Sequence, residues 1–231
     1  MNKKDFFAEL DRREQKGDFD AMLELLDSTI AKVPGDMDYF IERGRVLEEF
    51  YNSPTQGLLE YERAHAIEPS SQVPLQHICL ANLTLNDNES AMIVAEKALD
   101  LAPDDATSIY LLGLCRLNSG QTAEAIELLR FASEKTPEKS ECWTTLGHAY
   151  SKVGEYLKSL HAFQLACGLC EDSATHISKA RIYVKLGDAD NALKSLDFAA
   201  KLPMDANEKF LAERSRENAL RLKNNREMND S

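Results

Sequence analysis

One interval recurs along this chain and limits what it can fold into. Pro69, Pro103 and Pro137 stand 34 residues apart. Because proline lacks an amide hydrogen and disfavours helix at the preceding residue, each of these prolines is expected to mark the end of a helix. A period of this length indicates stacked helical hairpins, since a single hairpin cannot bury both of its faces. A series of small residues keeps the same 34-residue interval: Ala64, Ala98, Ala132 and Ala166.

The stretch from Cys142 to Ala166 shows one repeating unit clearly. Trp143, Leu146 and Tyr150 fall on one stripe of a predicted helix, and Gly154 then provides a turn. The letters W-x2-L-G-x2-Y at this point resemble the signature of the tetratricopeptide repeat (TPR), a helix-turn-helix unit. The resemblance implies an all-α fold, a right-handed α-solenoid (superhelix) of about thirteen helices.

The same interval divides the chain into repeats. We expect a single TPR solenoid domain over residues 1–224, with a capping helix at 207–224 that covers the last repeat. The polar residues 225–231 are predicted to form a disordered tail. The six repeats are 3–36, 37–71, 72–105, 106–139, 140–172 and 173–206.

Composition limits the class of partner and the compartment. The net charge of −12 disfavours nucleic acid and anionic membranes as partners, because both require a dense basic surface. The N-terminus lacks the apolar run of a secretory signal, and no segment has the roughly eighteen apolar residues of a membrane-spanning helix. The cysteines show no disulfide framework, which predicts reduced thiols and a cytoplasmic location. They are Cys79, Cys115, Cys142, Cys167 and Cys170.

The TPR resemblance also implies where a ligand lies, because the first helices of such repeats line a concave groove. Five of the groove positions predict a central apolar patch: Leu80, Leu83, Tyr110, Leu114 and Leu117. The remaining groove positions are Phe7, Ile41, Arg45, Gln76, Thr144, His148 and Arg181, with a basic rim at Arg181 and Lys185 and an acidic rim at Glu42, Glu48 and Glu49.

The patch has three interpretations. It could receive an apolar peptide or an amphipathic helix, as exposed apolar patches on proteins commonly do. The leucines could instead be buried between adjacent first helices. The groove could also be filled by Phe210 and Leu211 of the last helix, or by a second copy of the chain.

Two known TPR subtypes do not match the sequence. The chaperone-binding subtype grips a C-terminal carboxylate with lysine, arginine and asparagine, but the corresponding places hold Phe7, Asp11, Glu42, Val73 and His77. The glycosyltransferase subtype carries an asparagine ladder that is missing here. Neither subtype therefore identifies a partner.

The leading hypothesis is a non-enzymatic adaptor or scaffold that binds another protein, with no cofactor and no metal. We expect an apolar partner with some basic character. One alternative is a dedicated chaperone for a secreted or assembling partner. A second alternative, from another class, is a thiol-redox or zinc role at Cys167 and Cys170, although no catalytic or phosphate-binding motif appears.

Overall fold

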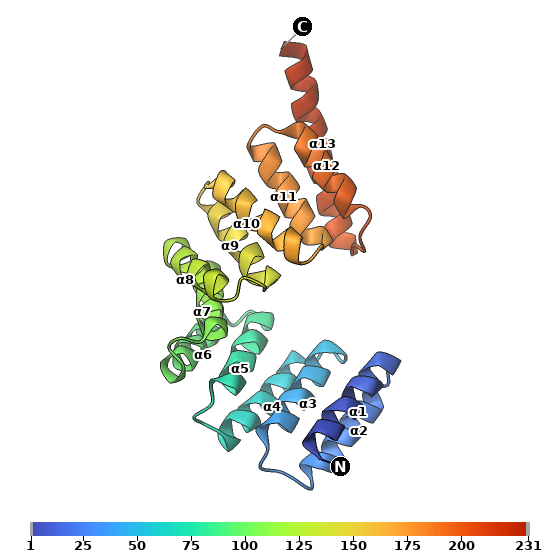
Figure 1. The fold of residues 1–231 in the computed structure, drawn as a ribbon, viewed down its shortest axis with the longest axis vertical. Coiled ribbons are helices and arrows are strands. Elements are labelled where there is room, and N and C mark those ends of the chain that lie inside the picture. Colours follow the sequence, from blue (N-terminus) through green and yellow to red (C-terminus); the bar gives the residue numbers. More distant parts are fainter. Residues whose placement is uncertain (1, 230–231) are drawn as a thin grey trace. The chain divides into compact units, whose positions relative to one another are not determined.

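The computed structural model describes residues 2–229, and the secondary structure in that range is entirely α-helical (Figure 1). This confirms the predicted all-α class, an α-solenoid of TPR hairpins, and it places thirteen helices among the described residues. The helices are α1 (Lys3–Lys16), α2 (Phe19–Ile30), α3 (Met37–Glu49), α4 (Pro54–Ile67), α5 (Gln72–Thr84), α6 (Asn88–Leu101), α7 (Ala106–Asn118), α8 (Thr122–Lys135), α9 (Ser140–Lys152), α10 (Tyr156–Leu169), α11 (Ser173–Lys185), α12 (Ala189–Ala199) and α13 (Ala206–Asn229).

The chain separates into two compact units. The N-terminal unit is Met1–Cys115 and the C-terminal unit is Arg116–Ser231, so the border falls within α7. The sequence had predicted one solenoid domain over residues 1–224. Each unit is built from the same hairpin, and the first helices of the six hairpins begin at the residues where the repeats were set to begin: Lys3, Met37, Gln72, Ala106, Ser140 and Ser173.

A left-handed residue forms the turn of every hairpin. Four of these residues are glycines with φ between 71° and 80°. In the second and third hairpins the residue is Asn52 or Asn86, with φ of 49° and 61°. Asparagine tolerates this conformation better than other non-glycine residues, which explains why the glycine spacing is interrupted at these two places.

Small residues let the two helices of a hairpin approach closely. A Cβ atom added to Gly147 of α9 would lie 2.8 Å from the Phe163 ring of α10. At the same crossing, the Ser159 hydroxyl donates a hydrogen bond of 2.7 Å to the Gly147 carbonyl. In the N-terminal unit, a Cβ on Gly44 of α3 would lie 2.5 Å from the Tyr61 ring of α4. An aromatic ring thus fills the space that each glycine leaves.

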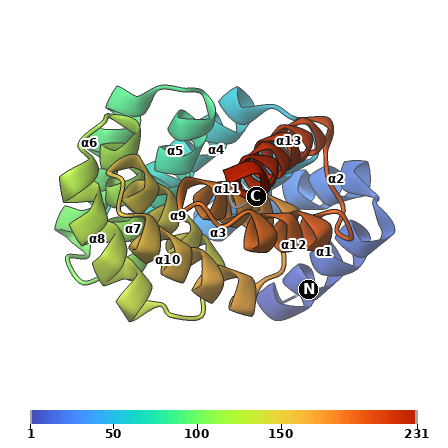
Figure 2. The ribbon, with the colours of Figure 1, turned by 90° about the horizontal axis from the view of Figure 1, so that it is seen from above.

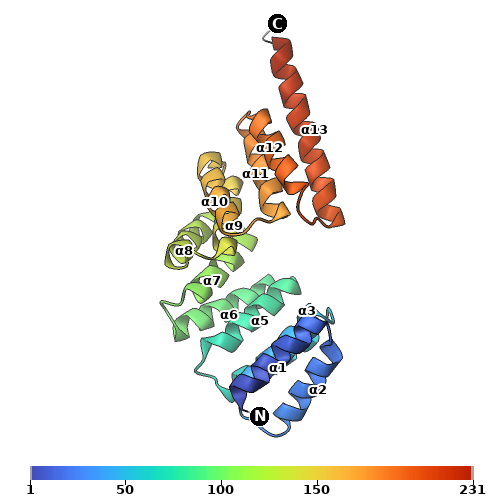
Figure 3. The same ribbon diagram turned by 45° about the vertical axis from the view of Figure 1, so that its right-hand side comes forward.

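The cap helix α13 packs on the last hairpin. Figures 2 and 3 show it beside α11 and α12, and Ala219 of α13 is buried with Ile177 and Leu196 in one apolar cluster. Its start is fixed by a reciprocal cap: Glu208 N donates to Asp205 Oδ1 at 2.7 Å and Asp205 N donates to Glu208 Oε2 at 3.0 Å.

The end of α13 corrects the sequence prediction. The helix was expected to stop at 224 and the chain to be disordered from 225, but it runs to Asn229. Arg226, Glu227 and Met228 are good helix formers, so they extend the helix although it is polar. Residues 230 and 231, the rest of the predicted tail, lie outside the described residues.

His176 is a polar residue buried in the core of the last hairpin. Its ring stacks on Phe198 at a centroid separation of 5.2 Å, and among the described residues neither ring nitrogen has a hydrogen-bond partner. Burial, with Lys179 nearby, lowers its pKa below the ordinary value of 6.5. As pH falls through about 6.5, His176 takes up a proton more readily in the unfolded chain than in the folded chain. The free energy of unfolding therefore decreases.

We expect His176→Phe to raise the free energy of unfolding by about 1 kcal/mol at pH 7, because the new ring keeps the stacking and leaves no unpaired nitrogen. The advantage over the original protein should grow between about pH 7 and pH 5, where protonation favours the unfolded chain. Urea unfolding at several pH values measures both effects. If the difference in unfolding free energy between the variant and the original protein stays constant with pH, the His176 pKa is not lowered in the folded chain.

Candidate functional site

In the N-terminal unit, four of the predicted groove residues are apolar or aromatic and are not fully buried, and together we call them the apolar patch: Leu80, Leu83, Tyr110 and Leu114. Leu80 on α5 keeps 41% of its surface exposed, while the other three are half-buried. Leu83 shares α5 with it, and the other two come from α7. The patch is therefore apolar, and part of it is open to solvent.

Contacts at two places along α5 hold it beside α7, the two helices that carry the apolar patch. Gln76 of α5 donates from Nε2 to Asp105 Oδ2 at 2.6 Å and to Ser108 Oγ at 3.0 Å. Further along, the Cys79 and Cys115 sulfur atoms lie 3.7 Å apart. Gln76, predicted as a groove residue, is thus engaged in joining these two helices.

Two other predicted groove residues lie in the protein core, and a third packs beside it. Ile41 is 7% exposed and belongs to an apolar cluster with Tyr61, and Leu117 is 5% exposed. Phe7 is half-buried, and its ring stacks on Tyr39 at a centroid separation of 6.1 Å. The alternative raised for the central patch, burial between helices, fits the burial of Leu117, and Ile41 outside that patch is similarly buried.

The predicted acidic rim is paired within the chain. Arg45 lies 2.8 Å from Glu14, 2.9 Å from Glu42 and 2.9 Å from Glu49, bringing three carboxylates to one guanidinium. Glu48 accepts a hydrogen bond of 3.1 Å from the Tyr61 hydroxyl. Glu49 still keeps 52% of its side chain exposed. We call Arg45 and its three partners the Arg45 cluster.

In the C-terminal unit, predicted groove residues lie on α9 and α11. The hydroxyl groups of Thr144 and Thr175 are 3.4 Å apart, and the exposed His148 packs edge-on against Phe163 with ring centroids 5.0 Å apart. The packing around the His148 ring, with the cations Arg181 and Lys152, lowers its pKa below 6.5. The lowered pKa disfavours a charged His148, and the cations near it are Arg181 and Lys152.

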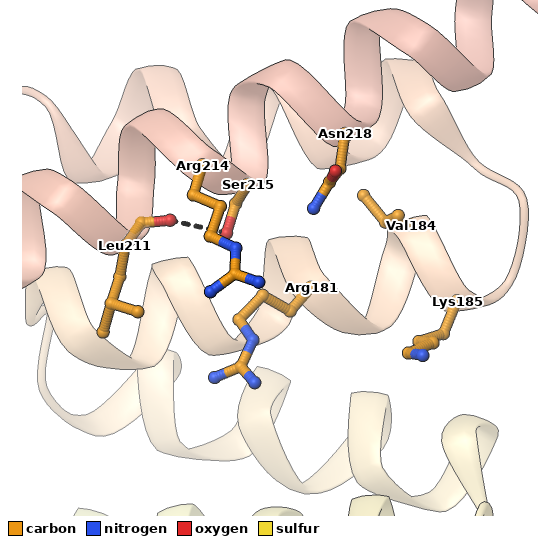
Figure 4. Close-up of a pocket in the computed structure, with 7 residues that line it drawn as sticks. All are labelled: Arg181, Val184, Lys185, Leu211, Arg214, Ser215 and Asn218. Carbon is orange, nitrogen blue, oxygen red and sulfur yellow. Dashed lines mark hydrogen bonds between the residues drawn. The ribbon is translucent and has the colours of Figure 1, made fainter.

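A pocket of about 310 Å³ opens between α11 and α13 (Figure 4). We call it the basic pocket. The sequence predicted Arg181 and Lys185 as basic-rim residues and Leu211 as a possible groove filler, but it did not predict Arg214, Ser215 or Asn218, because a nearly all-polar helix gives no sign of which face meets its neighbour. Phe210, which was considered as a groove filler, is 59% exposed. The lining residues are Arg181, Val184, Lys185, Leu211, Arg214, Ser215 and Asn218.

A second, more apolar hollow of about 510 Å³ lies among α8, α9 and α10. The signature residues Trp143, Leu146 and Tyr150 line it together with Leu157, which is 72% exposed. These residues belong to the repeat signature and fall on one stripe of α9. Leu146 is buried, but Trp143 and Tyr150 are half-buried and reach this surface.

The cysteines are free thiols in the described structure. Cys167 is at the end of α10, where burial raises its pKa, and Cys170 is exposed after the helix. A raised pKa favours the thiol, whereas a reactive or metal-binding cysteine requires the thiolate. Within residues 2–229, no three histidine, cysteine or acidic side chains gather as a metal site would require. In the same range, no helix is long and apolar enough to cross a membrane.

Comparison with known proteins adds family-level information. The family model for "Anaphase-promoting complex, cyclosome, subunit 3" matches residues 84–166. Superkiller complex protein 3 of Mus musculus is 31% identical over 127 residues, which cover 54% of this chain and 8% of that protein. The chain thus spans a small part of the length of that curated relative.

Solved structures share the fold. The crystal structure of the APC/C hetero-tetramer Cut9–Hcn1 matches with a TM-score of 0.81 at 17% identity, over 91% of this chain and 42% of that one. YrrB, described as a TPR protein with an unusual peptide-binding site, matches with a TM-score of 0.58 at 19% identity, over 83% of this chain and 97% of that one.

Proposed function

We propose that this chain, which is a tetratricopeptide repeat protein, is a non-enzymatic scaffold that binds another protein on the apolar patch of its N-terminal unit. The TPR fold supports a protein–protein interaction scaffold. The observation that carries the proposal is the exposure of Leu80 beside the half-buried Leu83 on α5. Full burial of a leucine side chain is worth about 1.5–3 kcal/mol relative to its exposure, so a partner that covers Leu80 gains affinity there.

The apolar patch is suited to binding because contacts hold its two helices together. The Gln76 hydrogen bonds and the contact between Cys79 and Cys115 hold α5 against α7 before any partner arrives. A preorganised surface loses less conformational entropy on binding than a flexible one. The partner segment that fits is an amphipathic helix or extended peptide with apolar side chains at regular spacing.

The charge of the partner is less constrained than the sequence suggested. Glu42 and Glu49 pair with Arg45, so they do not require a basic ligand. Three carboxylates around one guanidinium nevertheless leave the Arg45 cluster with a negative surplus. A partner lysine or arginine would meet it at the half-exposed Glu49, where an exposed pair adds about 0–1 kcal/mol.

The test is the double substitution Leu80→Glu with Leu114→Glu. Two carboxylates on the apolar patch should abolish most partner capture in a pull-down read by mass spectrometry, because each would be buried without a counterion. The matched control is Leu101→Glu with Leu59→Glu, which changes two more exposed leucines outside the patch.

Circular dichroism should show both double variants to be as helical as the original chain. Normal capture by the folded Leu80→Glu, Leu114→Glu variant would show that the patch is not the binding surface. If the lost partner is insoluble on its own, the scaffold acts as a chaperone for it.

A further inference from the structure

The basic pocket of the C-terminal unit concentrates positive charge in a chain whose net charge is −12. Three of its lining residues are cations, Arg181, Lys185 and Arg214, and the lining that the structure describes contains no acid. Figure 4 shows the guanidinium groups of Arg181 and Arg214 extending from α11 and α13 into the same space. Two like charges held close together repel each other, and an anion placed between them removes that repulsion.

The three pocket cations have no acidic partner within the chain that the structure describes. In the part of the chain that the structure describes, Arg181, Lys185 and Arg214 make no ion pair. Other cations of the same helix are paired: Arg216 lies 2.7 Å from Asp197, and Lys223 lies 2.8 Å from Asp190. Two cations of α13 outside the pocket, Arg216 and Lys223, thus pair with acids of α12, while Arg214 in the pocket makes no such pair.

The rest of the pocket suits a peptide. Val184 and Leu211 are half-buried and provide an apolar wall, while the exposed Asn218 can donate and accept hydrogen bonds. Ser215 donates to the Leu211 carbonyl at 2.7 Å, which fixes its hydroxyl at the pocket wall. A volume of about 310 Å³ lies at the small end of ligand pockets, which fits one or two side chains better than a large cofactor.

We propose that the basic pocket binds a carboxylate in an acidic segment of a partner protein. Guanidinium groups match the geometry of carboxylates with paired hydrogen bonds, and the apolar wall can accept the aliphatic side chain of a neighbouring residue. The acidic surface elsewhere repels such a segment, so the pocket determines where it binds. The inference rests on the proposed scaffold function and names the chemistry of a second contact, on a different unit from the apolar patch.

The binding test uses the full chain and fluorescent peptides. A peptide of alternating leucine and aspartate with an amidated C-terminus should bind, and its affinity should fall as salt rises from about 50 mM to about 300 mM. The same peptide with asparagine in place of aspartate should bind at least about tenfold more weakly. A third peptide has asparagine side chains and a free C-terminus. Binding of the aspartate peptide assigns the carboxylate to side chains, and binding of the third peptide alone assigns it to a chain end.

Variants localise the binding. Arg181→Gln with Arg214→Gln should weaken peptide binding at least about 30-fold, because two charge-assisted contacts are lost. Lys97→Gln with Lys209→Gln changes the net charge equally at exposed sites outside the pocket and should stay within about twofold. The thermal midpoint of the arginine variant should equal or exceed that of the original chain, since a repulsion is removed.

Should the double arginine variant fail to fold, Arg214→Gln alone should still weaken binding about fivefold. The Leu80→Glu, Leu114→Glu variant should bind the peptide normally, which separates this inference from the role of the apolar patch. Failure of every acidic peptide to bind, or equal binding by the original chain and the arginine variant, would overturn the inference and leave the apolar-patch proposal standing.

Discussion

Replacing Tyr61 with alanine is expected to lower the free energy of unfolding by about 3–5 kcal/mol, the usual range for truncating a fully buried aromatic ring. Tyr61 is 1% exposed and lies in the apolar cluster that includes Phe40, Ile41 and Leu75. It is also the ring that fills the space above Gly44 at the crossing of α3 and α4. The loss should appear as a lower urea midpoint followed by circular dichroism.

Two further variants show whether packing is the cause. Tyr61→Phe keeps the ring and removes only the hydrogen bond to Glu48, so its loss should be about 1 kcal/mol. Gly44→Ala should destabilise the original chain by about 1–3 kcal/mol because its Cβ meets the Tyr61 ring. In the Tyr61→Ala background Gly44→Ala should have much less effect, and equal effects in both backgrounds would contradict the proposed packing.

The hairpin architecture could be predicted from sequence because each repeat marks its own boundaries. Proline ends helices for a local steric reason, and a glycine or asparagine allows the left-handed turn, so spacing alone gives helix starts. The crossings of Gly44 with Tyr61 and Gly147 with Phe163 depend instead on packing between two helices, which this local rule does not give. The end of α13 was missed because it has no proline or glycine to mark it.

The binding surfaces were harder to predict because they depend on pairings between repeats. The repeat pattern predicts both Leu80 and Leu117 as apolar groove residues. In the structure Leu80 is 41% exposed, whereas Leu117 is 5% exposed. The sequence shows Glu42 and Glu49 as an acidic cluster, but it does not show that Arg45 points toward both of them. Nor does it show that Arg214 and Arg181 line one pocket, because α12 and the turns on either side of it separate them in the sequence.

Replacing Arg45 with methionine is expected to lower the free energy of unfolding by about 2 kcal/mol, the second large effect that we predict. The side chain of Arg45 is 24% exposed, and those of its three carboxylate partners are 25% to 52% exposed. The expected loss of unfolding free energy is therefore smaller than for a fully buried ion pair. Without the guanidinium, Glu14, Glu42 and Glu49 repel one another at the junction of α1 and α3.

The repulsion mechanism can be separated from a loss of packing. The deficit of Arg45→Met in urea unfolding should shrink as salt is raised, because salt screens partly exposed charges, whereas lost apolar packing would not respond in this way. Adding Glu42→Gln and Glu49→Gln should restore most of the stability by removing the like charges. Arg12→Met, which removes an exposed arginine paired with Glu9, should change stability by less than about 1 kcal/mol. A salt-independent deficit would mean that Arg45 stabilises the N-terminal unit through its aliphatic stem, and the Arg45 cluster would then carry no electrostatic role in holding α1 against α3.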